Sequence, residues 1–189
     1  MKALRVPVLA LALLLVLSTG LTACGNKTEI VTQGETEGAY IDVGPLVYQV
    51  QISRQLNPLD VEDHAYLEGV PLAERRLKAN EIWFAVFVRV QNDTDQPQAA
   101  SDDFEIVDTQ EEKFTPIELD PTNEWAYRGG LVPANGGLIP VADSPSADGV
   151  IGGSLLLFKL TLSSLSDRPL ELNITSASLD ATGRVSLDV

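Results

Sequence analysis

A stretch that is apolar on both faces runs from Glu81 to Gln91 and contains neither Gly nor Pro. One face carries Phe84, Val86, Val88 and Val90. The other face carries Trp83, Ala85 and Phe87, and Arg89 then interrupts it. β-Branched and aromatic residues favour strands, and a strand that is apolar on both faces belongs inside a sheet covered on both sides. The pattern therefore predicts the central strand of a β-sandwich.

A second strand of the same kind is predicted at residues 154–162, where the first residues are again apolar on both faces. The two strands share this pattern and lie far apart in the chain. We expect the 154–162 strand to be the partner of the 81–91 strand across the core.

Alternation of apolar and polar residues marks three further segments, at 46–53, 170–174 and 185–189. This period of two is typical of a strand with one face buried and one face in solvent. Each of these segments is therefore expected to lie on the surface of the sandwich, with its apolar residues pointing inward.

A hairpin is predicted from two short apolar segments, 104–107 and 114–119, which are separated by the turn formers of 108–112. Pro116 lies in the second arm and cannot donate to a strand ladder. The second arm is therefore expected at the edge of its sheet.

Two long connections complete the chain. Residues 54–80 are irregular, with one short helical turn expected at 72–79, and residues 120–153 contain four Pro and seven Gly. A loop as long as 120–153 is uncommon in a compact domain and is often functional. With seven to eight strands and almost no helix, the fold class predicted is all-β, an immunoglobulin-like antiparallel β-sandwich.

The amino terminus has the features of an export signal. Lys2 and Arg5 precede about 12 apolar residues, which is shorter than the roughly 20 needed to span a membrane. Leu21-Thr22-Ala23-Cys24 resembles a bacterial lipobox, which implies cleavage before Cys24 and a diacylglycerol on its sulfur. The alternative is an uncleaved signal anchor in which the cysteine is incidental.

This interpretation divides the chain into three parts. Residues 1–23 are the signal peptide, 24–39 the lipidated cysteine with a flexible linker, and 40–189 the sandwich domain. Two acyl chains suffice for stable anchoring, so the membrane is an expected partner through Cys24. The expected location is the extracytoplasmic face of the cell membrane.

Charge and composition exclude several partners. The formal net charge is −14, and it becomes −16 when the signal with its two basic residues is removed. Such a chain repels nucleic acid, so none is expected as a partner. The sequence has one cysteine, Cys24, and one histidine, His64, so we expect no disulfide in the domain, no soft-metal site and no cofactor.

Three segments resemble a recurrent bacterial pattern: Ile82–Asn92, Phe104–Asp108 and Gly152–Phe158. They are similar to the telokin-like, immunoglobulin-like domain of unknown function that follows lipoprotein signals, a fold shared by secreted immunogenic antigens of mycobacteria. The resemblance covers residues 46–175 and implies a sandwich fold and an envelope location. That family has no established catalytic residues, so the resemblance assigns none here.

Two acidic segments are candidates for cation sites. Asp60-Val61-Glu62-Asp63-His64 offers hard oxygen ligands, and Asn92-Asp93-Thr94-Asp95 begins like a calcium loop. The second segment continues with Gln96-Pro97 and has no closing Glu. We expect a solvated charge run in the first and turn chemistry in the second, with no metal bound.

A hydrolase would need a nucleophile with a base. Gly152-Gly153-Ser154-Leu155-Leu156 lacks the closing glycine of a nucleophile elbow, and no spacing assigns His64 to it. We therefore predict no catalytic residues and no enzyme.

The candidate binding loop contains Trp125, Tyr127 and Arg128 beside two glycines. Exposed aromatic residues with an arginine are typical of contacts to a peptide or glycan. Alternatively, the loop folds over the end of the sandwich with an aromatic ring as its plug. The function expected is a lipid-anchored, non-catalytic module that binds an envelope protein or ligand; the alternatives are a carrier or sensor of a small apolar ligand and, less favoured, an envelope hydrolase.

Overall fold

In the computed structural model, which describes residues 29–189, the predicted central strand is β4, Glu81–Asn92. It pairs antiparallel with β3 (Leu46–Leu56) on one side and β10 (Ser154–Thr161) on the other. The sheet has the order β10-β4-β3-β2, with β2 spanning Tyr40–Val43, and β9 (Gly137–Ile139) pairs with the end of β4. The prediction of a central strand is confirmed.

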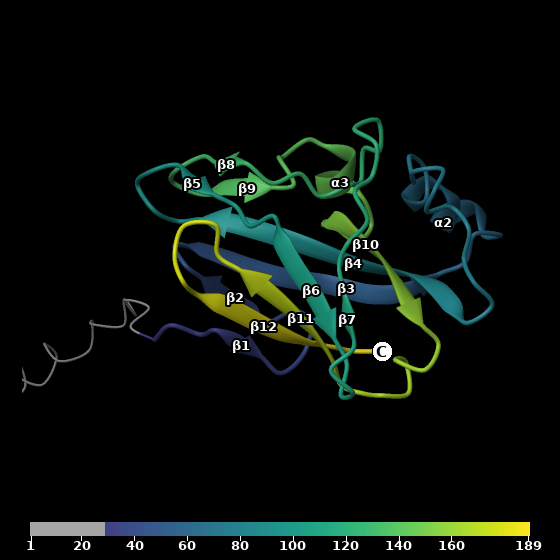
Figure 1. Ribbon diagram of the computed structural model, residues 1–189. Coiled ribbons are helices and arrows are strands. Elements are labelled where there is room, and N and C mark those ends of the chain that lie inside the picture. Colours follow the sequence, from purple (N-terminus) through teal and green to yellow (C-terminus); the bar gives the residue numbers. More distant parts are fainter. Residues whose placement is uncertain (1–28) are drawn as a thin grey trace, which may run out of the picture. The chain divides into compact units, whose positions relative to one another are not determined.

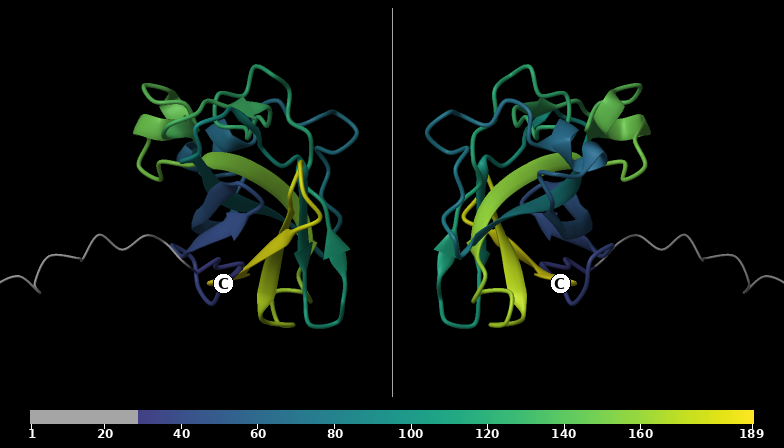
Figure 2. Two further views of the ribbon diagram at one scale, coloured as in Figure 1. Left: turned by 90° about the vertical axis from the view of Figure 1, so that its left-hand side faces the viewer. Right: turned by 90° about the vertical axis from the view of Figure 1, so that its right-hand side faces the viewer.

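A second sheet packs against the first, so the folded part of the chain is an all-β sandwich (Figures 1 and 2). Its order is β1-β12-β11-β6-β7, and only the β1–β12 pair is parallel. The bounds are β1 Gln33–Gly34, β6 Asp103–Val107, β7 Lys113–Phe114, β11 Leu170–Thr175 and β12 Thr182–Leu187. Two short strands, β5 (Gln98–Ala99) and β8 (Leu131–Val132), form a separate ladder.

Strand β4 separates two hydrophobic clusters, which explains why it is apolar on both faces. Phe84, Val86 and Val88 lie in the inter-sheet core with the inward residues of the second sheet. On the opposite face, Trp83 and Phe87 belong to an outer core that residues of the connecting segments cover. Burial of apolar side chains on both faces is the main term that stabilises this sheet.

The expected place of the 154–162 strand is wrong. Strand β10 lies beside β4 in the same sheet, in a register that pairs Ser154 with Val88 and Thr161 with Glu81. An apolar pattern on both faces indicates that both faces of a strand are buried. It does not indicate which elements bury them. Because the outer core covers this sheet, two such strands lie side by side within it.

The predicted hairpin forms between β6 and β7, with Ile106 opposite Phe114. The Asp108 carboxylate organises the turn by accepting hydrogen bonds at 2.9 Å from the backbone N–H groups of Gln110 and Glu112. Strand β7 is an edge strand, as predicted, but it ends at Phe114. Beyond Pro116 the chain crosses to the other sheet, where the Ile117 N–H donates to the Leu157 carbonyl at 2.7 Å.

The helical turn expected at 72–79 is also wrong, because the helix of this connection is α2, Val61–Tyr66. Asp60 caps it by accepting a hydrogen bond from the Glu62 N–H at 2.8 Å, which satisfies an otherwise free donor. A second short helix, α3 (Pro145–Asp148), lies in the long loop region. No helix within residues 29–189 is long and apolar enough to cross a membrane.

The folded unit begins at Val31, earlier than the boundary at residue 40 that the sequence suggested. The Arg184 N–H donates to the Thr32 carbonyl at 2.9 Å, and the Gly38 N–H donates to the Val50 carbonyl at 2.8 Å. Residues 31–39 therefore lie along the sheet edges, and this part of the predicted linker is ordered by backbone pairing. The signal segment and Cys24 lie outside the described residues.

Candidate functional site

The candidate binding loop is paired with the free edge of β10. The Leu155 N–H donates to the Trp125 carbonyl at 2.7 Å, and the Tyr127 N–H donates to the Leu155 carbonyl at 2.8 Å. Buried Asn123 fixes the approach to this pairing, because its Oδ1 accepts from the N–H groups of Trp125 and Ala126 at 2.9 and 3.0 Å. The loop is thus held as an extension of the sheet.

Trp125 contributes its ring to the outer core. The ring meets Tyr66 edge-to-face, with centroids 5.3 Å apart, and Tyr66 meets Phe87 of β4 in the same manner at 5.0 Å. Gly149 lies directly against the indole, since a Cβ there would be 2.8 Å from Trp125 Cζ3. Trp125 is half-buried and packs on the outer face of the β10-β4-β3-β2 sheet.

Tyr127 connects the two sheets. Its backbone pairs with β10, while its ring packs edge-to-face on Phe104 of β6, with centroids 5.0 Å apart. The hydroxyl donates to the Ser101 carbonyl at 2.8 Å, and the Ser101 N–H donates to the Tyr48 hydroxyl at 2.7 Å. Burial, with Tyr48 and the Asp102 carboxylate nearby, raises the pKa of Tyr127 far above its ordinary value, so the hydroxyl stays protonated.

Arg128 is exposed, and its Nη2 donates to the Asp120 carbonyl at 2.7 Å. The pKa of Asp120 lies below its ordinary value because Thr122 donates from its backbone and hydroxyl, with a further contribution from the Arg128 charge. The three residues of the candidate loop therefore have different surroundings: the outer core, the junction of the sheets and the surface.

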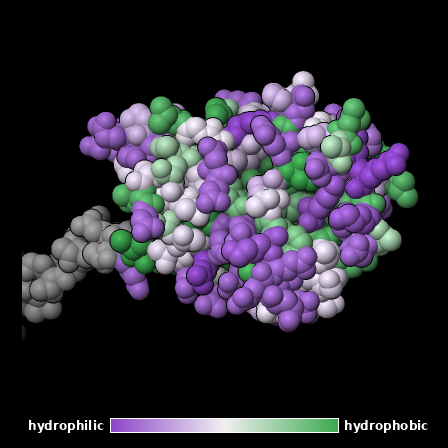
Figure 3. Space-filling model, in the orientation of Figure 1, coloured by the Kyte–Doolittle hydropathy of each residue, from purple (hydrophilic) through white to green (hydrophobic). Residues whose placement is uncertain are grey.

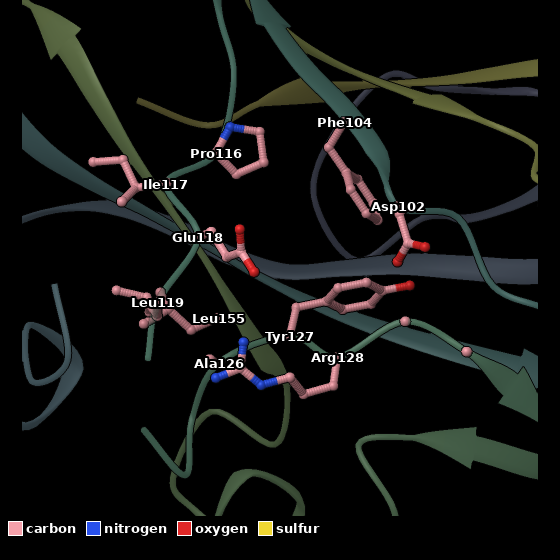
Figure 4. A pocket seen from close by; sticks show the side chains of 12 residues that line it. Asp102, Phe104, Pro116, Ile117, Glu118, Leu119, Ala126, Tyr127, Arg128 and Leu155 are labelled. Carbon is pink, nitrogen blue, oxygen red and sulfur yellow. The ribbon is translucent and has the colours of Figure 1, made fainter. Parts of the chain in front are cut away.

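A surface groove of about 580 Å³ lies beside Tyr127 (Figure 4). We call it the Tyr127 groove. Its walls are residues 116–119 and 126–130, and Asp102, Phe104 and Leu155 complete its lining. Both walls are hydrogen bonded to β10, through Leu157 and Leu155 respectively, so the groove has a fixed width set by backbone pairing.

The Tyr127 groove combines an apolar lining with charged groups. Figure 4 shows the Phe104 and Tyr127 rings with the Asp102 carboxylate at one end, and Glu118 on the wall that carries Pro116. Among residues 29–189, neither carboxylate has a hydrogen-bond or ion-pair partner. The Asp102 carboxylate lies against Gly129, where a Cβ would be 1.8 Å from Oδ1, so a larger residue there would displace the exposed Asp102 side chain.

The acidic segment at 60–64 does not assemble a cation site. Asp60 caps α2, buried Asp63 pairs with the Arg54 guanidinium, and His64 faces Glu68 at 3.8 Å. Burial would raise the pKa of Asp63, but the bonds from Arg54 and from the Asn57 N–H outweigh it and hold that pKa below its ordinary value. Nowhere in the described chain do three His, Cys, Asp or Glu residues converge on one point.

The segment at 92–95 makes a turn. Buried Asn92 accepts from the Thr94 N–H at 3.0 Å and donates through Nδ2 to the carbonyls of Gln96 and Val132, at 2.8 and 3.0 Å. Ser154, considered above as a nucleophile, is buried at the start of β10, and His64 is exposed on α2.

Taken together, the fold and the groove define a class: an all-β sandwich with a surface groove beside β10, the edge strand of one of its two sheets. Comparison with known proteins supports the fold. The YjhA protein of Bacillus subtilis is similar, with a TM-score of 0.52 and 11% identity over 82% of this chain and 99% of that chain. So is YcdA of the same species, described as a lipoprotein candidate, with a TM-score of 0.52 and 15% identity over 82% of this chain and 39% of that chain.

At these identities the likeness shows a shared fold and nothing about activity. No protein-family model matches the chain, and no curated protein sequence matches it. The resemblance to the telokin-like domain therefore stays a prediction. The sequence alone did not identify Ser101, Asp102 or Asn123 as residues of the site. Their roles depend on partners that are distant in the chain.

Proposed function

We propose that this protein is an exported, lipid-anchored, non-catalytic module of the cell envelope, with an immunoglobulin-like sandwich that binds an extended basic segment of another envelope protein in the Tyr127 groove. The observation that carries the proposal is the groove itself. It has walls fixed by hydrogen bonds, an apolar lining and two carboxylates that have no partner within residues 29–189.

The anchor is supported by the lipobox that ends at Cys24 and by the description of YcdA as a lipoprotein candidate. Between Cys24 and the start of the folded unit at Val31 lie only six residues. An anchored module of this kind works close to the membrane surface, where its partners are other envelope proteins.

The chemistry of the groove favours a basic segment. Pro116, Ile117 and Tyr127 are half-buried and offer apolar surface, and burial of one aliphatic side chain against such surface is worth about 1.5–3 kcal/mol. Asp102 and Glu118 outnumber Arg128, the one basic residue that lines the groove, and attract a lysine or arginine on the same segment. Complementary charge of this kind gives specificity and raises the association rate.

Groove binding is tested with extended peptides and the full chain in detergent. Peptides that alternate leucine with lysine are compared by fluorescence anisotropy with peptides in which glutamate replaces lysine. We expect binding of the basic set alone. Asp102→Asn combined with Glu118→Gln should weaken it at least about tenfold, since two charged contacts are lost.

Asp180→Asn is the matched control, because it removes one exposed carboxylate in the turn before β12, outside the groove. It should bind the basic peptides like the wild type. Equal binding of basic and acidic peptides, or an undiminished affinity of the double variant, would show that the groove does not select a basic segment.

A further inference from the structure

The outer face of the β10-β4-β3-β2 sheet has an uncovered half with its own row of side chains. The strand register places Tyr40 opposite Gln49 and Gln49 opposite Arg89, so the three lie in one line across β2, β3 and β4. Gln91 pairs with Val47 in the next row. We call Tyr40, Gln49, Gln51, Arg89 and Gln91 the Arg89 face.

The covering loops of the outer core leave this face partly exposed, with Gln49, Gln51 and Gln91 half-buried. Tyr40 is 61% exposed, and Arg89 is also exposed although it lies on the central strand. Arg89 lines two shallow hollows. One, of about 170 Å³, includes Tyr40, Gln49 and Gln91. The other, of about 190 Å³, lies toward Leu138 and Gly152.

The Arg89 guanidinium has no hydrogen-bond or ion-pair partner among residues 29–189, in a strongly acidic chain. Several other basic side chains are neutralised internally; those of Arg54, Lys78, Lys113 and Lys159 have acidic partners. A free guanidinium presents a planar set of donors that matches a carboxylate in a bidentate pair. Arg89 is therefore available to an external carboxylate.

The glutamines beside Arg89 are already oriented. Gln49 Nε2 donates to the Gly38 carbonyl at 2.7 Å, Gln51 Nε2 donates to Gln49 Oε1 at 2.5 Å, and Gln91 Nε2 donates to Asp93 Oδ1 at 2.6 Å. Each amide keeps a second N–H, and Oε1 of Gln51 and Gln91 can accept. Neutral amides that both donate and accept hydrogen bonds can bind hydroxyl groups, which also donate and accept hydrogen bonds.

We propose that the Arg89 face binds an oligosaccharide that carries a hexuronate, with its carboxylate on Arg89, its hydroxyls on the glutamine amides and a sugar ring over Tyr40. The face of a sheet presents side chains, whereas its backbone groups are paired within the sheet. A peptide strand would lack main-chain partners here. Asp143 and Asp148 line the second hollow and disfavour a dense polyanion, so the ligand carries isolated carboxylates.

The test uses the full chain in detergent and a glucuronosyl-N-acetylglucosamine disaccharide, followed by saturation-transfer NMR and calorimetry. The methyl ester of the disaccharide keeps the rings and removes the charge. Acetyl-alanyl-alanine supplies a peptide carboxylate for comparison. We expect the disaccharide to bind, and the ester and the peptide to bind at least about tenfold more weakly.

Arg89→Gln should reduce disaccharide affinity at least about tenfold, and Tyr40→Ala should also reduce it. Arg184→Gln is the matched control, because Arg184 is an exposed arginine on β12 of the other sheet. Unchanged affinity in Arg89→Gln, an equal loss in Arg184→Gln, or absence of binding at millimolar disaccharide would overturn the proposal. Preferential binding of the peptide would overturn the assignment to a sugar.

Discussion

Ser101 is held from both sides by tyrosine hydroxyls, and this contact ties the candidate loop to the inter-sheet core. Its N–H donates to Tyr48 and its carbonyl accepts from Tyr127, while the residue itself is fully buried. A buried backbone group that loses its partner costs more than the net value of the hydrogen bond, because water does not replace that partner. Tyr127 therefore has a structural role as well as a place in the groove.

Tyr127→Phe should lower the free energy of unfolding by about 1–2 kcal/mol, since the Ser101 carbonyl stays buried without its donor. Urea denaturation at neutral pH measures the change as a shift in midpoint at constant slope. Tyr40→Phe is the control, because that hydroxyl is on an exposed side chain, and it should change stability by less than about 0.5 kcal/mol. An equal effect of both variants would contradict this account of Ser101.

The ionisation of Asp63 makes the free energy of unfolding depend on pH. Its pKa is lower in the folded chain than in the unfolded chain, so its contribution is complete above the ordinary carboxyl pKa of about 4. The contribution is lost as the pH falls through the folded value, because the unfolded chain then binds the extra proton.

Asp63→Asn should cost about 2 kcal/mol at pH 7, the value of a charged hydrogen bond, and should flatten the decline in stability below about pH 4. Urea midpoints from pH 7 to pH 3 measure both effects. Glu62→Gln alters the neighbouring exposed carboxylate of α2 and should leave the pH profile close to that of the wild type. A wild-type decline in Asp63→Asn would exclude this carboxyl as a source of the acid sensitivity.

At the level of elements, strands with strong patterns could be predicted and their neighbours could not. The apolar positions of β4 and β10 correctly indicated cover on both faces, yet the outer core that provides it comes from connections with no periodic pattern. Two-residue strands such as β1 and β7 form because a longer strand offers them an edge, so their own sequence carries no signal. Helix α2 begins after its Asp60 cap, a signal that the expectation of a helical turn at 72–79 did not take into account.

The site shows the same division. Trp125, Tyr127 and Arg128 could be chosen because aromatic residues beside glycines are conspicuous in a sequence. Asp102 joins Tyr127 and Arg128 in one groove only because the two sheets pack together, and Trp125 lies outside that groove in the outer core. Contacts between segments so far apart depend on the register of the sheets, and no local pattern reports that register.

Gly183 on β12 illustrates how closely the elements approach. A Cβ at this position would lie 2.5 Å from Val43 Cγ2 and 2.8 Å from Ile41 Cδ1, and both side chains are fully or almost fully buried. Gly183→Ala should therefore destabilise the fold by about 1–3 kcal/mol, as overpacking does in other cores. Urea denaturation measures it. Gly136→Ala should not clash, since a Cβ there meets nothing within 4 Å, although its positive φ of 91° adds local strain.

A rescue experiment separates crowding from other effects of this change. Val43→Ala removes the atom nearest to the added Cβ, so the double variant should recover part of the loss seen in Gly183→Ala. Residues in contact are expected to couple in this way. Strictly additive losses would mean that the two residues do not compete for the same space.

The chain carries a strong negative charge. The face of the folded unit shown in Figure 3 is largely hydrophilic, with hydrophobic residues scattered over it. Such a surface is repelled by anionic headgroups and keeps the folded unit in solution. Attachment to a membrane is then expected through the amino-terminal segment, by the lipid proposed on Cys24 or by a signal anchor, and raised salt should not release the protein. This separates lipid anchoring from electrostatic adsorption, which salt weakens.

The decisive measurement for the anchor is the mass of the amino terminus of membrane-extracted protein. A lipoprotein should begin at Cys24, lack residues 1–23 and carry a diacylglycerol, and it should enter the detergent phase on phase separation. Cys24→Ser removes the acceptor sulfur, so the variant should appear as a precursor that keeps residues 1–23 or as a protein released from the membrane. A signal anchor behaves differently, because its attachment depends on the apolar segment and not on the thiol. Wild-type protein that begins at Met1, or a Cys24→Ser variant with unchanged mass and membrane retention, would therefore replace the lipoprotein with a signal-anchored module.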